Sequence, residues 1–150
     1  VRVGELVSIN RNDVDWNTGN VIVYGEKNRK YRTVCIDDTA RYYLKKYIDS
    51  RTDSDPALFV SGISPIKRIQ DSGVREVLKS IRKRAGMERR VYPHLFRKTT
   101  ATNMVRRGCP RDLVAFYLGH ANGDIKTLNK YYAATDPQQI IQAFWKYGAA

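Results

Sequence analysis

The stretch of residues 92–132 constrains this chain more than any other part, because it contains both histidines of the protein, His94 and His120. A helix pattern begins directly after Pro93, where a proline in the first turn removes no helical hydrogen bond. Gly108, with a proline two residues later, ends that pattern as a glycine cap. The stretch therefore predicts a helix that carries one histidine close to its start.

The spacing within this helix brings two polar side chains together. His94 and Arg97 are three residues apart, so an imidazole and a guanidinium point from adjacent turns of one face. Apolar residues recur along the helix and predict its buried side: Phe96, Ala101, Met104 and Val105. A second helix is predicted over residues 111–118, and it ends at Gly119 and His120.

Composition indicates one globular domain with an anionic partner. The chain has 150 residues, of which 42% are hydrophobic, enough for a single core. Lys and Arg outnumber Asp and Glu by 27 to 15, which gives a net charge of +12 and favours binding to polyanions such as nucleic acid. A run of about 18 apolar residues is missing, as is a signal-peptide pattern, so we expect a cytoplasmic protein with no membrane partner.

Several familiar chemistries lack their sequence patterns here. Cys35 and Cys109 are far apart, with neither C-x-x-C nor H-E-x-x-H, so we expect ordinary thiols and no metal site. The sequence has no carboxylate cluster for two-metal hydrolysis and no G-x-x-x-x-G-K-[ST] for nucleotide hydrolysis. These missing patterns argue against two-metal hydrolysis and against nucleotide hydrolysis.

The order of the motifs resembles a known family. H-L-F-R-K-T-T-A-T, then R-R-G-C-P-R-D-L-V-A-F-Y-L-G-H, then a tyrosine before A-A-T-D-P, are similar to the catalytic domain of the tyrosine recombinases, or phage integrase family. The resemblance implies a mainly α-helical fold with a small β-hairpin or sheet, an α+β class. It also implies that DNA is cleaved and rejoined through a 3′-phosphotyrosine by protomers assembled as a tetramer on double-stranded DNA. The resemblance further implies that this reaction needs no metal and no high-energy cofactor.

Two alternatives belong to other functional classes. A type IB topoisomerase uses a related active site on one duplex, and a non-catalytic DNA-binding module could keep the same fold. The L-G-H motif and the compact spacing of the motifs favour the recombinase.

The first residues resemble another family motif. V-R-V-G-E-L has an apolar helical stripe without an N-cap, so we expect the chain to begin inside a helix. The resemblance makes Arg2 the first active-site arginine and Glu5 the acidic residue of that motif. It further implies that residues 1–150 form a single, N-terminally truncated catalytic domain, without the separate N-terminal DNA-binding domain of such enzymes.

A β-hairpin is predicted from V-I-V-Y-G and K-Y-R-T-V-C-I-D, which flank a basic turn. The family places an active-site lysine on this hairpin. Lys27 is our choice and Lys30 the alternative, because Glu26 follows the turn glycine where the family has lysine. Cations near the turn and on the central helix are the expected DNA contacts: Arg29, Lys30, Arg32 and Lys98.

Three more helices and one buried run complete the expected fold. A helix over residues 37–51 carries apolar positions at Ala40, Tyr43, Leu44, Tyr47 and Ile48, whose aromatics we expect in the core. Residues 58–60 form a short buried run. A helix over residues 72–85 carries Val74, Val77, Leu78 and Ile81 on one side, and a helix begins at Pro137.

The nucleophile lies at one of two adjacent tyrosines. T-L-N-K-Y resembles the family's approach to Tyr131, whereas Y-A-A-T-D-P-Q-Q-I-I resembles its continuation after Tyr132. Adjacent helical residues point about 100° apart, so only one of them can serve. We choose Tyr132, because the downstream resemblance covers more positions, and keep Tyr131 as the alternative.

These residue types suit the transfer of a phosphoryl group. Attack on a phosphodiester builds negative charge on its non-bridging oxygens, and the guanidiniums of Arg2 and Arg97 can each donate two hydrogen bonds to them. His94 and His120 can donate hydrogen bonds or exchange protons near neutral pH. Nearby cations make a tyrosine hydroxyl a better nucleophile, and a hairpin lysine can protonate the leaving 5′ oxygen.

Overall fold

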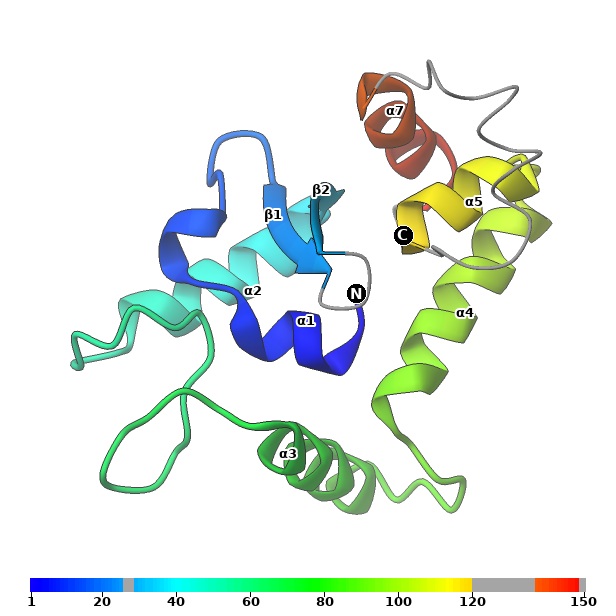
Figure 1. Cartoon of the computed structure of the whole chain (residues 1–150). Coiled ribbons are helices and arrows are strands. Elements are labelled where there is room, and N and C mark those ends of the chain that lie inside the picture. Colours follow the sequence, from blue (N-terminus) through cyan, green and yellow to red (C-terminus); the bar gives the residue numbers. More distant parts are fainter. Residues whose placement is uncertain (26–28, 120–136, 149–150) are drawn as a thin grey trace.

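The computed structural model describes residues 1–25, 29–119 and 137–148 (Figure 1). Its elements are α1 (Val3–Ser8), the 3-10 helix η1 (Arg11–Asp13), β1 (Asn20–Gly25), β2 (Lys30–Cys35), α2 (Asp38–Asp49), α3 (Asp71–Arg84), α4 (Pro93–Arg106), α5 (Arg111–Leu118) and α7 (Pro137–Tyr147). The predicted class, mainly α with a small β-hairpin, is confirmed. Within the described ranges, no helix is long and apolar enough to span a membrane.

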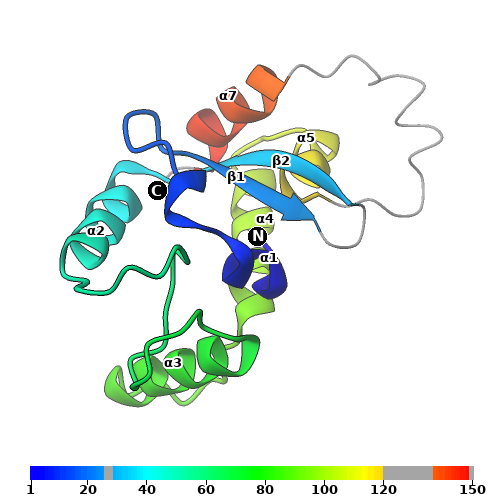
Figure 2. The same cartoon turned by 60° about the vertical axis from the view of Figure 1, so that its left-hand side comes forward.

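The hairpin is an antiparallel pair with one buried face. Its register runs from Asn20 opposite Cys35 to Gly25 opposite Lys30. Along β1, Val21 and Val23 are buried and the residues between and after them are exposed, the alternation expected of a strand that covers a core. In Figure 2 the hairpin crosses the molecule with α7 above it and α1 below it.

The first core cluster lies beneath the hairpin and is formed by Ile9, Val14, Val21, Val23, Val34 and Leu58. α2 flanks it, capped by the Asp37 carboxylate, which accepts a hydrogen bond from the Ala40 backbone N–H at 2.7 Å. Leu44 and Ile48 pack against the cluster as predicted. The prediction is wrong for Ala40 and for Tyr43, which is 64% exposed, because α2 meets the core along a narrow stripe and buries none of its residues fully.

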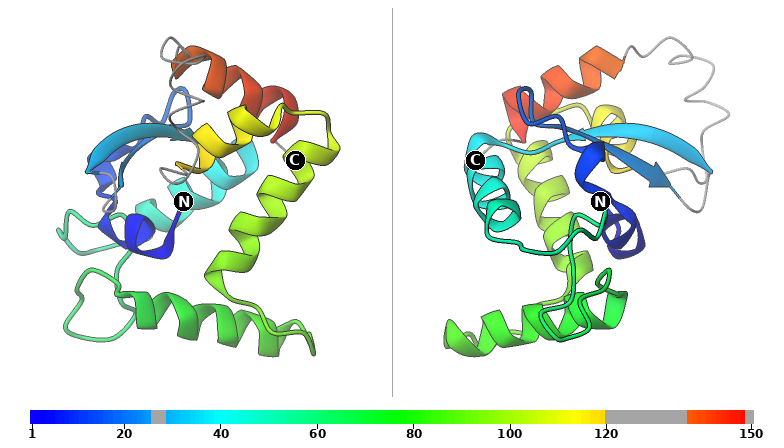
Figure 3. Two further views of the ribbon diagram at one scale, coloured as in Figure 1. Left: turned by 45° about the vertical axis from the view of Figure 1, so that its right-hand side comes forward. Right: turned by 90° about the vertical axis from the view of Figure 1, so that its left-hand side faces the viewer.

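The second core cluster joins α4, α5 and α7 and is formed by Met104, Cys109, Val114, Leu118 and Ala143. These helices meet at one end of α4, and α3 lies at its other end (Figure 3). Tyr117 packs against both clusters, and its ring stacks on Phe144 at a centroid distance of 5.4 Å. The two clusters therefore form one connected interior.

The predicted buried side of α4 is half wrong. Met104 is fully buried and Ala101 packs against the second cluster, but Phe96 is 54% exposed and Val105 is 37% exposed. Arg97 is buried instead. Phe96 is exposed because the N-terminal half of α4 lines an open pocket together with residues of α1 and α3, whereas the C-terminal half packs against α5 and α7.

The apolar side of α3 is also less covered than predicted. Val74 is buried and Leu78 is half-buried, but Val77 and Ile81 are 50% and 43% exposed. α3 contacts α1 and α4, and its exposed Ile81 lines the open pocket between α3 and α4.

Candidate active site

The candidate site begins at the N-terminus of α1. Arg2 has an extended backbone and is the N-cap residue, so the helix begins at Val3 and the expectation that it starts before the chain does is wrong. The cause is local, because the Glu5 carboxylate accepts a hydrogen bond from the Arg2 backbone N–H at 2.6 Å. Glutamate at the third helical position is well suited to that bond.

Glu5 binds two guanidiniums. Its carboxylate is 2% exposed and accepts hydrogen bonds from Arg2 Nη1 at 3.0 Å and from Arg32 Nη1 and Nη2 at 2.9 and 2.8 Å. Burial by itself would raise the pKa of Glu5, but the hydrogen bonds from Arg32 and Arg2 outweigh it and lower the pKa to about 2. Glu5 is therefore a fixed negative charge at neutral pH.

Arg97 reaches the same region from α4. Its side chain is buried, and Nη2 donates to the Leu118 carbonyl at the end of α5. Among the described residues, its buried Nη1 has no hydrogen-bond partner. Burial, and then the charges of Arg2 and Arg32, lower the pKa of Arg97 to about 10, so it stays cationic near neutral pH.

The end of α5 provides carbonyls for two arginines. Gly119, the C-cap residue, has φ +64°, a conformation that favours glycine. Its carbonyl accepts a hydrogen bond from Arg2 Nη2 at 3.1 Å, next to the Leu118 carbonyl that binds Arg97. Arg2 and Arg97 are 95 positions apart in the sequence, yet they donate hydrogen bonds to two consecutive carbonyls, Arg2 to that of Gly119 and Arg97 to that of Leu118.

Three of the predicted catalytic residues line one pocket. Arg2, His94 and Arg97 surround a cavity of about 150 Å³, together with Arg75 of α3 and Tyr92. His94 is exposed on the first turn of α4. The pocket is therefore lined by guanidiniums and an imidazole, a donor set suited to an anion.

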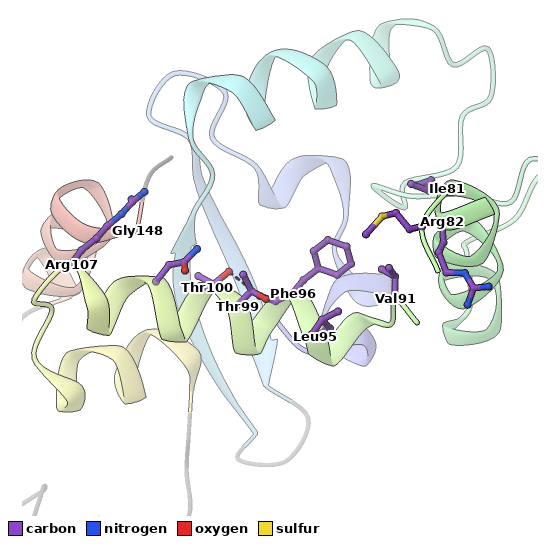
Figure 4. Close-up of a pocket in the computed structure, with 11 residues that line it drawn as sticks. Ile81, Arg82, Val91, Leu95, Phe96, Thr99, Thr100, Arg107 and Gly148 are labelled. Atoms are coloured by element: carbon purple, nitrogen blue, oxygen red, sulfur yellow. Dashed lines mark hydrogen bonds between the residues drawn. The ribbon is translucent and has the colours of Figure 1, made fainter. Parts of the chain in front are cut away.

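A larger cavity of about 520 Å³ lies elsewhere, between α3 and α4 (Figure 4). Its lining is mainly apolar and includes Ile81, Met87, Val91, Leu95 and Phe96. Arg82 and Arg107 also line it, but without a histidine or carboxylate beside them. The smaller arginine pocket is therefore the candidate active site.

The remaining predicted site residues do not line this pocket in the part of the chain that the structure describes. Lys27, His120, Tyr131 and Tyr132 lie outside the described residues. Arg29, with φ +51° at the turn, is exposed, as are Lys30 and Lys98.

We expected Arg32 at the exposed tip of the hairpin, but it does not lie there. It lies opposite Val23 in the middle of the strand pair and turns inward to Glu5, with its side chain 15% exposed. The alternation of β2 carried the missed signal, because Arg32 lies two residues before the buried Val34 and so on the same face of the strand. Arg75 of α3 also lines the candidate pocket, and no sequence motif had indicated it.

The chain was compared with known proteins. A family model described as the phage integrase family matches residues 1–138. The chain belongs to this family. Tyrosine recombinase XerD of Oceanobacillus iheyensis is 36% identical over 142 residues, covering 90% of this chain and 46% of that protein. Tyrosine recombinase XerA of Pyrococcus furiosus is 33% identical over 123 residues, covering 81% of this chain and 42% of that protein.

A solved structure supports the same family and fold. The crystal structure of XerA recombinase matches with a TM-score of 0.73 and 28% identity, over 97% of this chain and 52% of that one. The phage integrase family chain described here thus spans about half the length of the relatives it matches. Among its described residues, no group of three or more His, Cys, Asp or Glu side chains could hold a metal ion.

Proposed function

We propose that this protein is a site-specific tyrosine recombinase, in which residues 1–150 form the catalytic domain that cleaves and rejoins double-stranded DNA. One observation carries the proposal: Arg2, His94 and Arg97 converge on a single pocket from α4 and the start of α1. The names of the relatives, tyrosine recombinases XerD and XerA, support the same activity.

The unpaired donor of Arg97 favours a phosphate ligand. A buried N–H without a partner is unfavourable by about 1–3 kcal/mol, and an anionic oxygen placed beside it removes that penalty. Arg97 Nη1 is such a donor within the described residues. Arg2 lines the same pocket, so two guanidiniums can hold the non-bridging oxygens as their charge increases during the reaction.

The proposed reaction conserves the energy of the phosphodiester. The hydroxyl of Tyr132, or of Tyr131 as the alternative, transfers its proton to an acceptor imidazole, His94 or His120, and attacks the phosphorus. A bond forms between the tyrosine oxygen and phosphorus, and the bond to the 5′ oxygen breaks. Lys27, or Lys30 as the alternative, donates a proton to the leaving 5′ oxygen, which becomes a free 5′ hydroxyl. His94 and His120 donate hydrogen bonds or exchange protons at this centre. Attack by a 5′ hydroxyl on the phosphotyrosine reverses these steps and rejoins the strand.

The proposed partners are double-stranded DNA and further protomers, assembled as a tetramer on that DNA. The net charge of +12 supports a polyanionic partner, and the exposed cations Arg29, Lys30 and Lys98 are our candidates for phosphate contacts. The proposed location is the cytoplasm, and no cofactor is required.

A nicked suicide substrate tests the proposal. Loss of a short 5′ fragment traps the covalent complex, and peptide mass spectrometry then locates the adduct. The DNA comes from sequence that flanks the source element, and the natural protein is used. An adduct on Tyr132 is expected; one on Tyr131 would keep the function and change the nucleophile. Bound DNA without any adduct would contradict the proposal and favour a binding module.

Two adjacent positions on α4 provide a matched pair of variants. Arg97→Ala is expected to reduce cleavage by about a hundredfold or more while DNA binding is largely kept. Lys98→Ala, at an exposed position, should bind DNA slightly more weakly and cleave at a normal rate once DNA is saturating. Normal cleavage by Arg97→Ala would contradict the assignment of the site.

A further inference from the structure

Arg32 has the contacts of an internal support. Its Nη1 and Nη2 donate to the two carboxylate oxygens of Glu5, at 2.9 and 2.8 Å, across 27 positions of the chain. A two-point pair of this kind fixes the plane of the guanidinium as well as its distance. Both terminal nitrogens are therefore engaged inside the protein, whereas a phosphate contact needs such donors to face the DNA.

Gly119 lies directly against the same guanidinium. A Cβ at this position would lie 2.9 Å from both Cζ and Nε of Arg32, closer than real Cβ atoms approach other groups. The left-handed backbone of Gly119, with φ +64°, disfavours a side chain as well. The glycine thus lets the arginine of β2 pack against the end of α5.

Arg2 and Arg32 share both of these neighbours. Arg2 Nη1 donates to Glu5 Oε1 at 3.0 Å, and its Nη2 donates to the Gly119 carbonyl at 3.1 Å. Arg32 holds both oxygens of that carboxylate and packs against that glycine. Arg2 is therefore held in the pocket by two groups that Arg32 also contacts.

We propose that Arg32 is a positioning residue for the DNA cleavage proposed above: it fixes Glu5 and the Gly119 turn, and through them the guanidinium of Arg2, without touching DNA. The inference rests on the proposed function. Lysine keeps the charge but has one ammonium group in place of a planar fork, so it cannot hold both oxygens of Glu5 in this arrangement. A misplacement of about 1 Å in an active site can slow a reaction about a hundredfold.

The test compares Arg32→Lys with unsubstituted natural protein on the suicide substrate. We expect the cleavage rate at saturating DNA to fall about tenfold or more, while the DNA dissociation constant stays within about twofold. The dependence of binding on salt should not change. Loss of one phosphate contact would instead reduce the slope of log affinity against log salt concentration by about one. Arg29→Ala, at the exposed turn, serves as the reference for that reduction.

Val23→Ala controls for stability, because Val23 is paired with Arg32 across the hairpin, is fully buried, and makes none of the bonds to Glu5. It should destabilise the fold and leave the cleavage rate of folded protein near normal. Arg32→Gln, which keeps a single amide donor group, replaces Arg32→Lys if the lysine variant does not fold.

Three results would overturn the inference. One is a cleavage rate for the Arg32 variant no lower than that of Val23→Ala. Another is a reduced salt slope, which would make Arg32 a phosphate contact. Failure of the unsubstituted protein to form an adduct would overturn the proposed function and this inference together, whereas the other two results leave the proposed function standing.

Discussion

Arg32 on β2 and Glu5 on α1 form a two-point ion pair, with N to O distances of 2.9 and 2.8 Å and the carboxylate only 2% exposed. This pair ties the hairpin to the helix whose N-cap residue is Arg2. Since the hairpin also carries the candidate lysine, the pair links two parts of the proposed active site that the sequence separates.

The Glu5 pair predicts a loss of stability in acid. The pKa of Glu5 is lowered to about 2 from 4.5, so its contribution is complete above about pH 5 and disappears as the pH falls toward 2. The pKa difference gives a loss of roughly 2 kcal/mol in the free energy of unfolding between about pH 6 and about pH 3. Urea unfolding at both pH values measures it. Glu5→Gln should remove this part of the pH dependence, and an identical pH dependence in that variant would contradict the prediction.

Arg51 is expected to support the loop after α2. Its side chain is 4% exposed and donates to the carbonyls of Ala57, Leu58 and Asp55, and to the Asp53 carboxylate. Arg51→Ala leaves these carbonyls unpaired and should lower the free energy of unfolding by about 2–3 kcal/mol.

Lys45→Ala is the control for Arg51. Lys45 lies in an exposed pair with Asp49 on α2, so this change should alter the free energy of unfolding by about 0.5 kcal/mol or less. Arg51→Lys should not restore stability, because a single ammonium group cannot replace the planar guanidinium, which donates hydrogen bonds to several acceptors at once. Equal effects of the Arg51 and Lys45 changes would show that the loop does not depend on Arg51.

On α4, replacing the smaller Met104 by alanine should destabilise the fold more than replacing the larger Phe96. Met104 is fully buried in the second cluster, so Met104→Ala should lower the free energy of unfolding by about 2–5 kcal/mol. Phe96 is larger but 54% exposed, and Phe96→Ala should lower it by less than about 1 kcal/mol. Urea unfolding of both variants checks the order, and a greater loss for Phe96→Ala would mean that its ring is covered in solution.

Both thiols should resist modification in the folded protein. Cys35 and Cys109 are 5% and 3% exposed, and burial raises the pKa of Cys35 to about 11 and also raises that of Cys109. Because the thiolate is the reactive form, labelling by a thiol reagent near pH 8 should be slow and should accelerate in urea as the protein unfolds. A cysteine introduced at the exposed Ser72 should react rapidly under the same conditions. Rapid labelling of the unsubstituted protein in buffer would contradict the burial of both thiols.

The local elements and the family could be predicted from the sequence. Pro93 and Gly108 mark the two ends of α4, and alternating β-branched residues form the hairpin, because each of these signals acts over a few neighbouring residues. The ordered motifs indicated the tyrosine recombinases, and membership of the phage integrase family is confirmed.

Which side chains are buried depends instead on contacts between distant parts of the chain. On α4 the apolar Phe96 is exposed and the charged Arg97 is buried. Arg97 can be buried because it donates a hydrogen bond to the Leu118 carbonyl, 21 residues away in the sequence. Arg32 turns inward for a similar reason, since its carboxylate partner is Glu5 on a different element. A charged side chain can be buried only where a hydrogen-bonding or oppositely charged partner lies beside it, and partners from distant segments come together only when the chain has folded.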